Sequence, residues 1–322
     1  MPRRSSPTPL ASYRAGPVHG RRVPRPVAPG TVHRLRVVAR RPGRPGPIVG
    51  SVNDWPEGTG QAGAGGGDAA GAREHVAWSG RDGAQAFAAV EAATDWLLGY
   101  PFVFRALARK IDSGHVLVDY GCGPGKVADH AARLLGARVL GVDTSPEMLA
   151  LARGSGTAVA EFHLVDGDRT VCLPDGGADA VMCNHVLASL PTEAAVLSVF
   201  REIHRLLRPG APLVLLATDP ACSGTEYASL RIGEPGWEYG PGDALAVRLR
   251  RSDGTWQEMA NHAWPVDACP PLLERAGFRN VVQHRPTVEE AFGVVDAEFA
   301  ASRTWSAERA NPPLVITTAF AV

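Results

Sequence analysis

A glycine-rich turn preceded by an acidic residue is the strongest candidate for ligand chemistry in this sequence. The run from Val116 to Gly125 reads VLVDYGCGPG, so that an apolar strand leads directly into three closely spaced glycines, Gly121, Gly123 and Gly125. Glycines at such a position let the backbone approach a bound ligand closely, and the helix that follows directs its free N–H groups toward that ligand. The turn therefore predicts a binding site at the start of a helix.

The spacing of the turn and its acidic residue distinguish between the ligands that such turns bind, which include NAD, flavins and S-adenosylmethionine. The dinucleotide pattern requires glycine three residues after its second glycine, and Lys126 stands there, so the spacing is GxGxG rather than GxGxxG. The carboxylate of Asp119 would repel a pyrophosphate, whereas it suits a cationic amino acid. S-Adenosylmethionine is therefore favoured, and an NAD-dependent oxidoreductase remains the weaker alternative.

Polar residues also follow the later apolar runs of the sequence. Asp143 ends the next run, about twenty residues past the turn, where a carboxylate accepts hydrogen bonds from ribose hydroxyls. Asp168 and Arg169 follow the third run, at a loop where the edge of an adenine could be recognised. Asn184 and His185 follow the fourth run. Because open α/β sheets bind ligands at the carboxyl ends of their strands, these residues are candidates for one shared site.

The elements that position these residues alternate between short apolar runs and amphipathic helices, which is typical of a parallel sheet covered by helices on both faces. The strands expected in that alternation are 116–120, 138–142, 162–165, 178–183 and 212–217, and the helices are 126–135, 146–153 and 193–207. The alternation stops after residue 217. A short helix at 270–276 and two strands at 280–284 and 314–320 complete the expected α/β fold.

Two segments outside the alternation are expected to cover the carboxyl ends of the strands. Residues 74–114 are expected to form a helical lid, in which a helix from residue 84 is interrupted by Pro101 before a second helix at 102–111. Residues 219–262 are expected to form an insertion over the site. Within it, the turn Ser252-Asp253-Gly254 between two apolar runs predicts a β-hairpin.

The order of the motifs resembles that of a known family. VLVDYGCGPG, VLGVDTSPEMLALAR, VDGDRT, LPDGGADAVMCNHVLASL and REIHRLLRPGAPLVLL together are similar to the class I S-adenosylmethionine-dependent methyltransferases, and specifically to the branch that acts on small molecules. The resemblance spans about residues 78–322. It implies a Rossmann-like sheet of seven strands, mostly parallel, whose last strand is antiparallel and lies between the fifth and sixth. It also implies S-adenosylmethionine as the cofactor.

The resemblance also implies which residues hold that cofactor. It places the glycine turn at the methionine moiety, Asp143 at the ribose, the loop after the third strand at the adenine, and Asn184 near the methyl group. Tyr100 resembles the tyrosine that many such enzymes lay over the cofactor, although a core tyrosine remains an alternative. The predicted cofactor-binding residues are Tyr100, Asp119, Gly121, Cys122, Gly123, Gly125, Asp143, Thr144, Met148, Asp168, Arg169 and Asn184.

Methyl transfer from a sulfonium is an in-line displacement, so holding the acceptor in place contributes most, roughly 7–11 kcal/mol, and a general base adds about 3–5 kcal/mol. The candidates for catalysis are His262, His185, Asp219 and Tyr227. Aromatic side chains in the insertion favour a flat or cationic acceptor, unless the hairpin only builds a core of its own. N-, O- and C-methylation all stay open. The other residues of the expected acceptor wall are Glu226, Trp237, Tyr239 and Trp264.

The first part of the chain differs from the rest in composition and charge. Residues 1–73 are dominated by Arg, Pro, Gly and Ala, and the first 49 residues contain eleven arginines but no Asp or Glu. Such a segment buries too little apolar surface to offset its ordering entropy, so we expect a disordered tail followed by a methyltransferase domain at 74–322. Of the 33 Lys and Arg residues, 22 remain for the rest of the chain, which holds all 33 Asp and Glu.

The expected partners and compartment follow from these features. An acidic domain disfavours a broad phosphate-binding face, so the expected partner is a small-molecule acceptor rather than nucleic acid or a membrane. An RNA or protein methyltransferase that uses the basic tail is the alternative, and a homodimer is compatible with the sequence. The five cysteines lack a CxxC pair, and no apolar run reaches the roughly 20 residues of a membrane span. We therefore expect a cytoplasmic protein with reduced thiols and no metal site.

Overall fold

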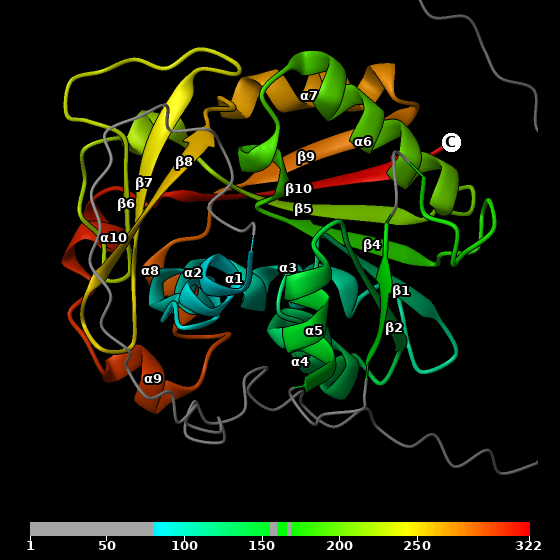
Figure 1. The fold of residues 1–322 in the computed structure, drawn as a ribbon, viewed down its shortest axis with the longest axis horizontal. Helices are drawn as coiled ribbons and strands as arrows, with labels where there is room; N and C mark the ends of the chain where they lie inside the picture. The colour runs from blue at the N-terminus through cyan, green and yellow to red at the C-terminus, as the bar shows by residue number, and fades with distance from the viewer. Residues whose placement is uncertain (1–79, 155–159, 166–168) are drawn as a thin grey trace, which may run out of the picture. The chain divides into compact units, whose positions relative to one another are not determined.

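The computed structural model describes residues 80–154, 160–165 and 169–322, which are coloured in Figure 1. The expected tail at 1–73 lies outside the described residues. In the part of the chain that is described, none of the helices has the length and apolar character needed to cross a membrane. All five cysteines lie in this part and are free thiols.

A seven-stranded sheet with the order β3-β2-β1-β4-β5-β10-β9 carries the fold (Figure 1). Strand β10 runs antiparallel to both of its neighbours, β5 and β9, whereas β1 to β5 are parallel to one another. The expected Rossmann-like sheet is therefore confirmed, with its last strand inserted between the fifth and sixth. The strands are β1 (Val116–Tyr120), β2 (Arg138–Asp143), β3 (Ala160–Leu164), β4 (Ala180–Asn184), β5 (Pro212–Thr218), β9 (Phe278–His284) and β10 (Leu314–Ala321).

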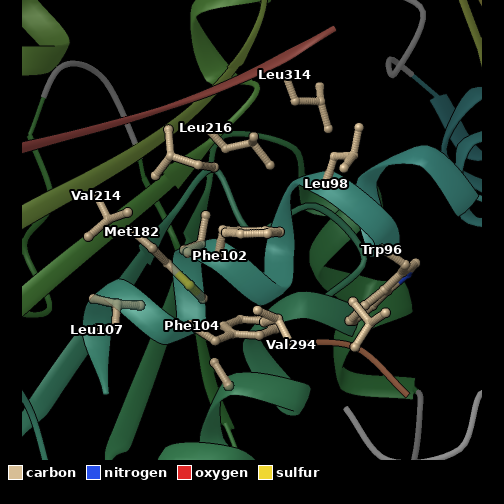
Figure 2. Close-up of a cluster of buried hydrophobic side chains, with 14 of the residues drawn as sticks. Trp96, Leu98, Phe102, Phe104, Leu107, Met182, Val214, Leu216, Val294 and Leu314 are labelled. Atoms are coloured by element: carbon tan, nitrogen blue, oxygen red, sulfur yellow. The ribbon is translucent and has the colours of Figure 1, made fainter. Parts of the chain in front are cut away.

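Helices cover both faces of this sheet, because the central strands are apolar on both sides. On one face, Met182, Val214 and Leu216 of the sheet meet Phe102 and Leu107 of helix α3 (Figure 2). A second buried cluster on the other face joins the sheet to α6 and α7. Each large side chain buried in this way contributes roughly 1.5–3 kcal/mol. The helices between the strands are α4 (Lys126–Leu135), α5 (Pro146–Gly154), α6 (Glu193–Leu206) and α7 (Cys269–Arg275).

The segment before β1 forms three short helices: α1 (Gly80–Ala88), α2 (Ala93–Leu98) and α3 (Tyr100–Leu107). Pro101 lies in the first turn of α3, as expected. The prediction of one unbroken helix from residue 84 to this proline is wrong, because the chain also breaks at Ala92, which has a left-handed φ of 53°. There the backbone pairs with the insertion instead, since Val90 forms a β-bridge with Arg251.

The insertion contains the predicted hairpin, formed by β7 (Ala244–Arg250) and β8 (Trp256–His262), and a third strand that was not predicted, β6 (Leu230–Ile232). Successive side chains of a strand point to opposite faces, so alternate residues of these strands share one face. Three further short helices between β9 and β10 were also not predicted. They are α8 (Val288–Ala291), α9 (Ala297–Ala301) and α10 (Ser306–Ala310).

Candidate active site

A cavity of about 730 Å³ lies at the carboxyl ends of the parallel strands, where the sequence predicts the ligand site. Its inner wall is formed by the ends of β1, β2, β4 and β5 with the loops that follow them, and its outer wall by α2, α3 and the insertion sheet. The described residues that line it include no Lys or Arg. This cavity is the candidate active site.

The glycine turn forms one side of the cavity through Gly121 and Gly123. Both have positive φ angles, 76° and 52°, which residues with a side chain rarely adopt. A Cβ at Gly121 would lie 2.3 Å from the Cγ2 atom of Val186, so this glycine is required by packing. A Cβ at Gly123 would have Phe87 as its nearest neighbour, at 3.7 Å, so the backbone there borders open space. A ligand can therefore reach the Gly123 peptide, whereas Gly125 does not line the cavity.

Asp143 lies beside the turn and lines the cavity. Its Oδ2 accepts a hydrogen bond from the backbone N–H of Gly123 at 2.7 Å, and its Oδ1 accepts one from the N–H of Ser145 at 2.9 Å. Each carboxylate oxygen has a second lone pair, so both can still accept from hydroxyl groups. Asp143 thus has the capacity to hold a ribose while it also fixes the glycine turn, a role that the sequence did not reveal.

Asp119 and Cys122 do not line the cavity, although both were predicted to hold the cofactor. Asp119 is only 1% exposed, and burial, together with the nearby Asp143, raises its pKa to about 8. Its Oδ2 atom has no hydrogen-bond partner among the described residues. Burial likewise raises the pKa of the Cys122 thiol. Both side chains lie buried next to the turn.

Asn184 is a strong candidate for a contact with the ligand. It lines the cavity, and both its Oδ1 and Nδ2 atoms are buried without a hydrogen-bond partner in the described part of the chain. A buried polar group left unpaired costs roughly 1–3 kcal/mol, so such groups usually mark a missing partner. Asn184 stands at the end of β4, where the resemblance places the methyl group.

Three other predicted cofactor residues, Tyr100, Thr144 and Met148, also line the cavity. Tyr100 packs edge-to-face against Trp96 with ring centroids 4.9 Å apart, and burial raises its pKa well above the usual range, so the phenol stays neutral. Only part of the loop after β3, which was expected to bind the adenine, belongs to the described residues. Asp168 lies outside the described residues, and the Arg169 side chain is 64% exposed, pairs with Asp175 and does not line the cavity.

Two of the four predicted catalytic residues, His185 and His262, line the cavity. The Nε2 atom of His185 lies 2.8 Å from Oδ1 of Asp95, on helix α2. The Nδ1 atom of His262 lies 3.1 Å from the carbonyl oxygen of Gly242. Because a carbonyl only accepts, Nδ1 of His262 carries the hydrogen. Asp95 was missed by sequence reasoning, since no motif links residues that lie 90 positions apart.

The other two, Asp219 and Tyr227, are held in structural contacts outside this cavity. Asp219 pairs with the guanidinium of Arg285, and its Oδ1 accepts from the N–H of Ala221 at 2.9 Å. The hydroxyl of Tyr227 donates to the carbonyl of Asn311 at 2.8 Å, and both side chains are buried. The structure therefore does not bring either residue to the reacting groups.

The expected aromatic wall is mostly aliphatic. Trp264 lines the cavity, whereas Glu226, Trp237 and Tyr239 do not, and Trp237 is 69% exposed. The outer wall is formed by one face of the insertion sheet, because its strands place the apolar residues in register. The aliphatic residues of that face are Leu230, Ile232, Leu245, Val247, Leu249 and Met259.

Fold and site together define a Rossmann-like methyltransferase. Residues 118–215 match a family described as a methyltransferase domain. The chain is 36% identical to N-demethylindolmycin N-methyltransferase of Streptomyces griseus over 219 residues, which cover 66% of this chain and 92% of that protein. It is 35% identical to trans-aconitate 2-methyltransferase of Methylobacterium radiotolerans, over 59% of this chain and 69% of that one.

Among solved structures, an S-adenosylmethionine-dependent methyltransferase from Mesorhizobium loti is 23% identical, covers 70% of this chain and 97% of that chain, and has a TM-score of 0.47. From the sequence relatives, the chain belongs to the class I S-adenosylmethionine-dependent methyltransferases that act on small molecules. The predicted family and cofactor are confirmed, and the alternative of an NAD-dependent oxidoreductase is set aside.

Proposed function

We propose that this enzyme methylates an amine nitrogen of a small, largely apolar specialised metabolite. The observation that carries the proposal is the character of the cavity. Its outer wall is aliphatic, its described lining holds no cation, and two histidines, His185 and His262, border it. Such a wall favours an acceptor that buries apolar surface and presents one reactive polar atom.

The charge of the lining separates acceptor classes. Among the described residues that border the cavity, the ionisable acids are Asp95, Asp143 and Glu147. A substrate with several carboxylates would lose its hydration there without gaining a cationic partner, which is costly. A neutral amine meets no such penalty. The cavity therefore favours an amine over a polycarboxylate.

The relatives support the same choice. The relative from Streptomyces griseus, which this chain matches over 92% of that protein, is named for N-methylation of N-demethylindolmycin. The trans-aconitate 2-methyltransferases match less of their own length or at lower identity. Nitrogen is therefore the methylated atom that we propose.

The described residues fit S-adenosylmethionine, since the unpaired atoms of Asn184 and the open backbone at Gly123 border one region with Asp143. We assign the ribose to Asp143, the methionine end to Asn184 and the glycine turn, and the cover over them to Tyr100. When bound, the cofactor supplies a methyl group: a bond forms between the acceptor nitrogen and the methyl carbon while the carbon–sulfur bond breaks, and its electron pair stays on sulfur.

The chain itself orients the acceptor and takes up a proton. Ile232, Val247 and Met259 lie side by side across the three strands of the insertion sheet and exclude water from the reacting atoms. Orientation of this kind supplies roughly 7–11 kcal/mol. The nitrogen must also lose a proton, and the two histidines of the cavity are suited to accept it.

The test uses the full-length protein with methyl-deuterated S-adenosylmethionine and four candidate acceptors: an arylalkyl secondary amine, a phenol, trans-aconitate and total RNA. Mass spectrometry should find the deuterated methyl group on the amine nitrogen. Label on the phenol, on a carboxylate or on RNA instead would overturn the proposal.

A matched pair of variants checks that the insertion sheet holds the acceptor. Val247→Arg places a cation in the aliphatic wall and should abolish amine methylation while the affinity for S-adenosylhomocysteine is kept. Val282→Arg makes the same change on the exposed edge strand β9 and should retain both. Equal activity in the two variants would exclude the insertion face as the acceptor site.

A further inference from the structure

We infer that Asp95 is a positioning residue for His185, holding the imidazole so that its Nδ1 atom accepts the proton from the methylated nitrogen. This inference rests on the proposed function of the cavity. Asp95 lies in helix α2, outside all the motifs by which the sequence resembles its family. The contacts of the two side chains carry it.

The hydrogen bond between the two residues determines which ring nitrogen accepts. Nε2 of His185 lies 2.8 Å from Oδ1 of Asp95. An ionised carboxylate only accepts, so Nε2 keeps its hydrogen, and the lone pair of the neutral ring is on Nδ1. His185 lines the cavity next to Asn184, the residue assigned to the methyl-donor end. The acceptor lone pair is therefore available on the side of the ring away from Asp95.

The backbone of His185 is held as firmly as its ring. Its φ is 60°, a left-handed conformation that non-glycine residues seldom adopt outside turns and functional sites. Its N–H donates to the carbonyl of Leu216 on β5 at 2.8 Å. The ring of Tyr100 stands edge-on to the imidazole, with centroids 6.5 Å apart. These contacts fix the backbone of His185 and place the ring of Tyr100 beside its imidazole.

A buried polar network holds helix α2 in place. Thr94, the neighbour of Asp95, donates from its hydroxyl to Oε1 of Glu308 at 3.0 Å, and its N–H donates to Oγ of Ser229 at 2.9 Å. Oε1 of Glu308 also accepts from the N–H of Ala228 at 2.9 Å. Thr94, Ser229 and Glu308 are all buried. Helix α2 is therefore tied to the acceptor insertion, and the position of Asp95 is tied to the wall that binds the acceptor.

His185 faces a full carboxylate, which stabilises the imidazolium as it forms. Tyr100 lies beside His185, and the other ionisable groups among the described lining residues are His262, Asp143 and Glu147. No cation among the described lining residues opposes the new charge on His185.

The proton balance is simple. Once the nitrogen carries the methyl group, it bears a positive charge and still holds its hydrogen. That proton moves to Nδ1 of His185, the product leaves as a neutral amine, and the imidazolium returns the proton to water. The carboxylate of Asp95 compensates the charge of the ring.

The first test reads the tautomer of His185 directly and needs no acceptor. Nitrogen-15 NMR of the full-length protein should show neutral His185 with its hydrogen on Nε2, and Asp95→Leu should spread the hydrogen over both nitrogens. Asp112→Leu is the matched control, because Asp112 is 76% exposed and contacts a different histidine, His115, at 3.0 Å. It should leave the His185 signals as they are.

The second test uses the amine that is methylated in the assay above. Asp95→Leu should lower kcat by roughly 10²-fold with little change in KM, and Asp95→Glu should restore part of the loss. The inference would be overturned if the tautomer of His185 were unchanged in Asp95→Leu. It would also be overturned if Asp95→Leu lost affinity for S-adenosylhomocysteine by the same factor as it lost kcat. The absence of any methylated amine would overturn the proposed function instead, so the two failures are distinguishable.

Discussion

The carboxylate of Asp143 accepts a hydrogen bond from the backbone N–H of Gly123 at 2.7 Å, which joins the end of β2 to the turn that follows β1. The same carboxylate accepts from Ser145 at the start of the next helix. A residue that the family resemblance assigns to the ribose therefore also orders the loop that approaches the rest of the cofactor. Loss of its charge should disturb both tasks at once.

Asp143→Asn tests this double role. The amide keeps one oxygen but turns an NH₂ group toward one of the two backbone donors, so at least one charge-assisted hydrogen bond is lost. The ribose hydroxyls would likewise bond a neutral amide in place of a carboxylate. Because a hydrogen bond to a charged group contributes roughly 1.5–3 kcal/mol, we expect about a 10- to 150-fold weaker affinity for S-adenosylhomocysteine. Isothermal titration calorimetry measures it. Asp112→Asn on the surface should bind as the unchanged protein does, and equal affinities for the two variants would refute the assignment.

Gly121→Ala tests whether the turn needs glycine for its conformation or for space. The new methyl group would lie 2.3 Å from Cγ2 of Val186, and φ would stay at 76°. Gly254→Ala is the control, because its φ is 83° and nothing lies within 4 Å, so only the conformational cost of roughly 1–2 kcal/mol applies. Gly121→Ala should lower the free energy of unfolding clearly more than Gly254→Ala does.

Adding Val186→Ala to Gly121→Ala removes the clashing methyl group. The double variant should recover stability toward the level of the Gly254→Ala control, measured by urea unfolding. If Val186→Ala gives no recovery, the Gly121 site is limited by its backbone angle and not by packing against Val186.

The central strands of the parallel sheet were predictable because each of them is a short apolar run bounded by turn residues. The bounds of β1 and α4 agree with the prediction, since Gly121 follows β1 and Gly125 and Gly136 flank α4. The break at Ala92 was not predictable from local pattern, since alanine favours helix. There, pairing between Val90 and Arg251, far along the chain, overrides local preference.

Some residues of the candidate site were likewise predictable from the sequence, and others were not. Residues that follow a strand, such as Asp143 and Asn184, were predicted to share an edge and do so, because parallel strands end together. Residues in the insertion were assigned by type alone, and Tyr227 instead lies in the buried core of the insertion. Asp95 could be found only from the folded chain, because its partner His185 lies on another element.

Thr94→Val should destabilise the protein through the network that anchors α2. Valine has nearly the same shape but lacks the hydroxyl that donates to Glu308, so a buried carboxylate loses one of its donors. Such a loss costs roughly 1–3 kcal/mol in the free energy of unfolding. Thr255→Val removes a hydroxyl that bonds Asp253 in an exposed turn and serves as the control. Urea unfolding should separate the two variants, and equal stability would show that the network does not anchor α2.

The raised pKa of Asp119 should make the stability of the protein fall as pH rises, which is the opposite of the usual effect of a carboxylate. Burial and Asp143 raise its pKa from 3.8 to about 8, so the folded protein binds this proton more tightly than the unfolded chain does. Between about pH 4 and pH 8 the unfolded chain releases the proton first, and the stability contributed by this group falls as pH rises. Each pH unit in that window changes the free energy of unfolding by up to about 1.4 kcal/mol.

Asp119→Asn should remove this dependence, because the amide stays neutral and resembles the protonated acid. Relative to the unchanged protein, the variant should gain stability by roughly 1 kcal/mol per pH unit from pH 5 to pH 8 in urea unfolding. Asp175→Asn is a control of opposite sign, since its hydrogen bond to Arg205 lowers the pKa of Asp175 and stabilises the fold above the usual carboxylate range. Relative to the unchanged protein, Asp175→Asn should gain no stability as pH rises from 5 to about 8. A stability difference between Asp119→Asn and the unchanged protein that stays constant across this range would mean that Asp119 is ionised in the folded state.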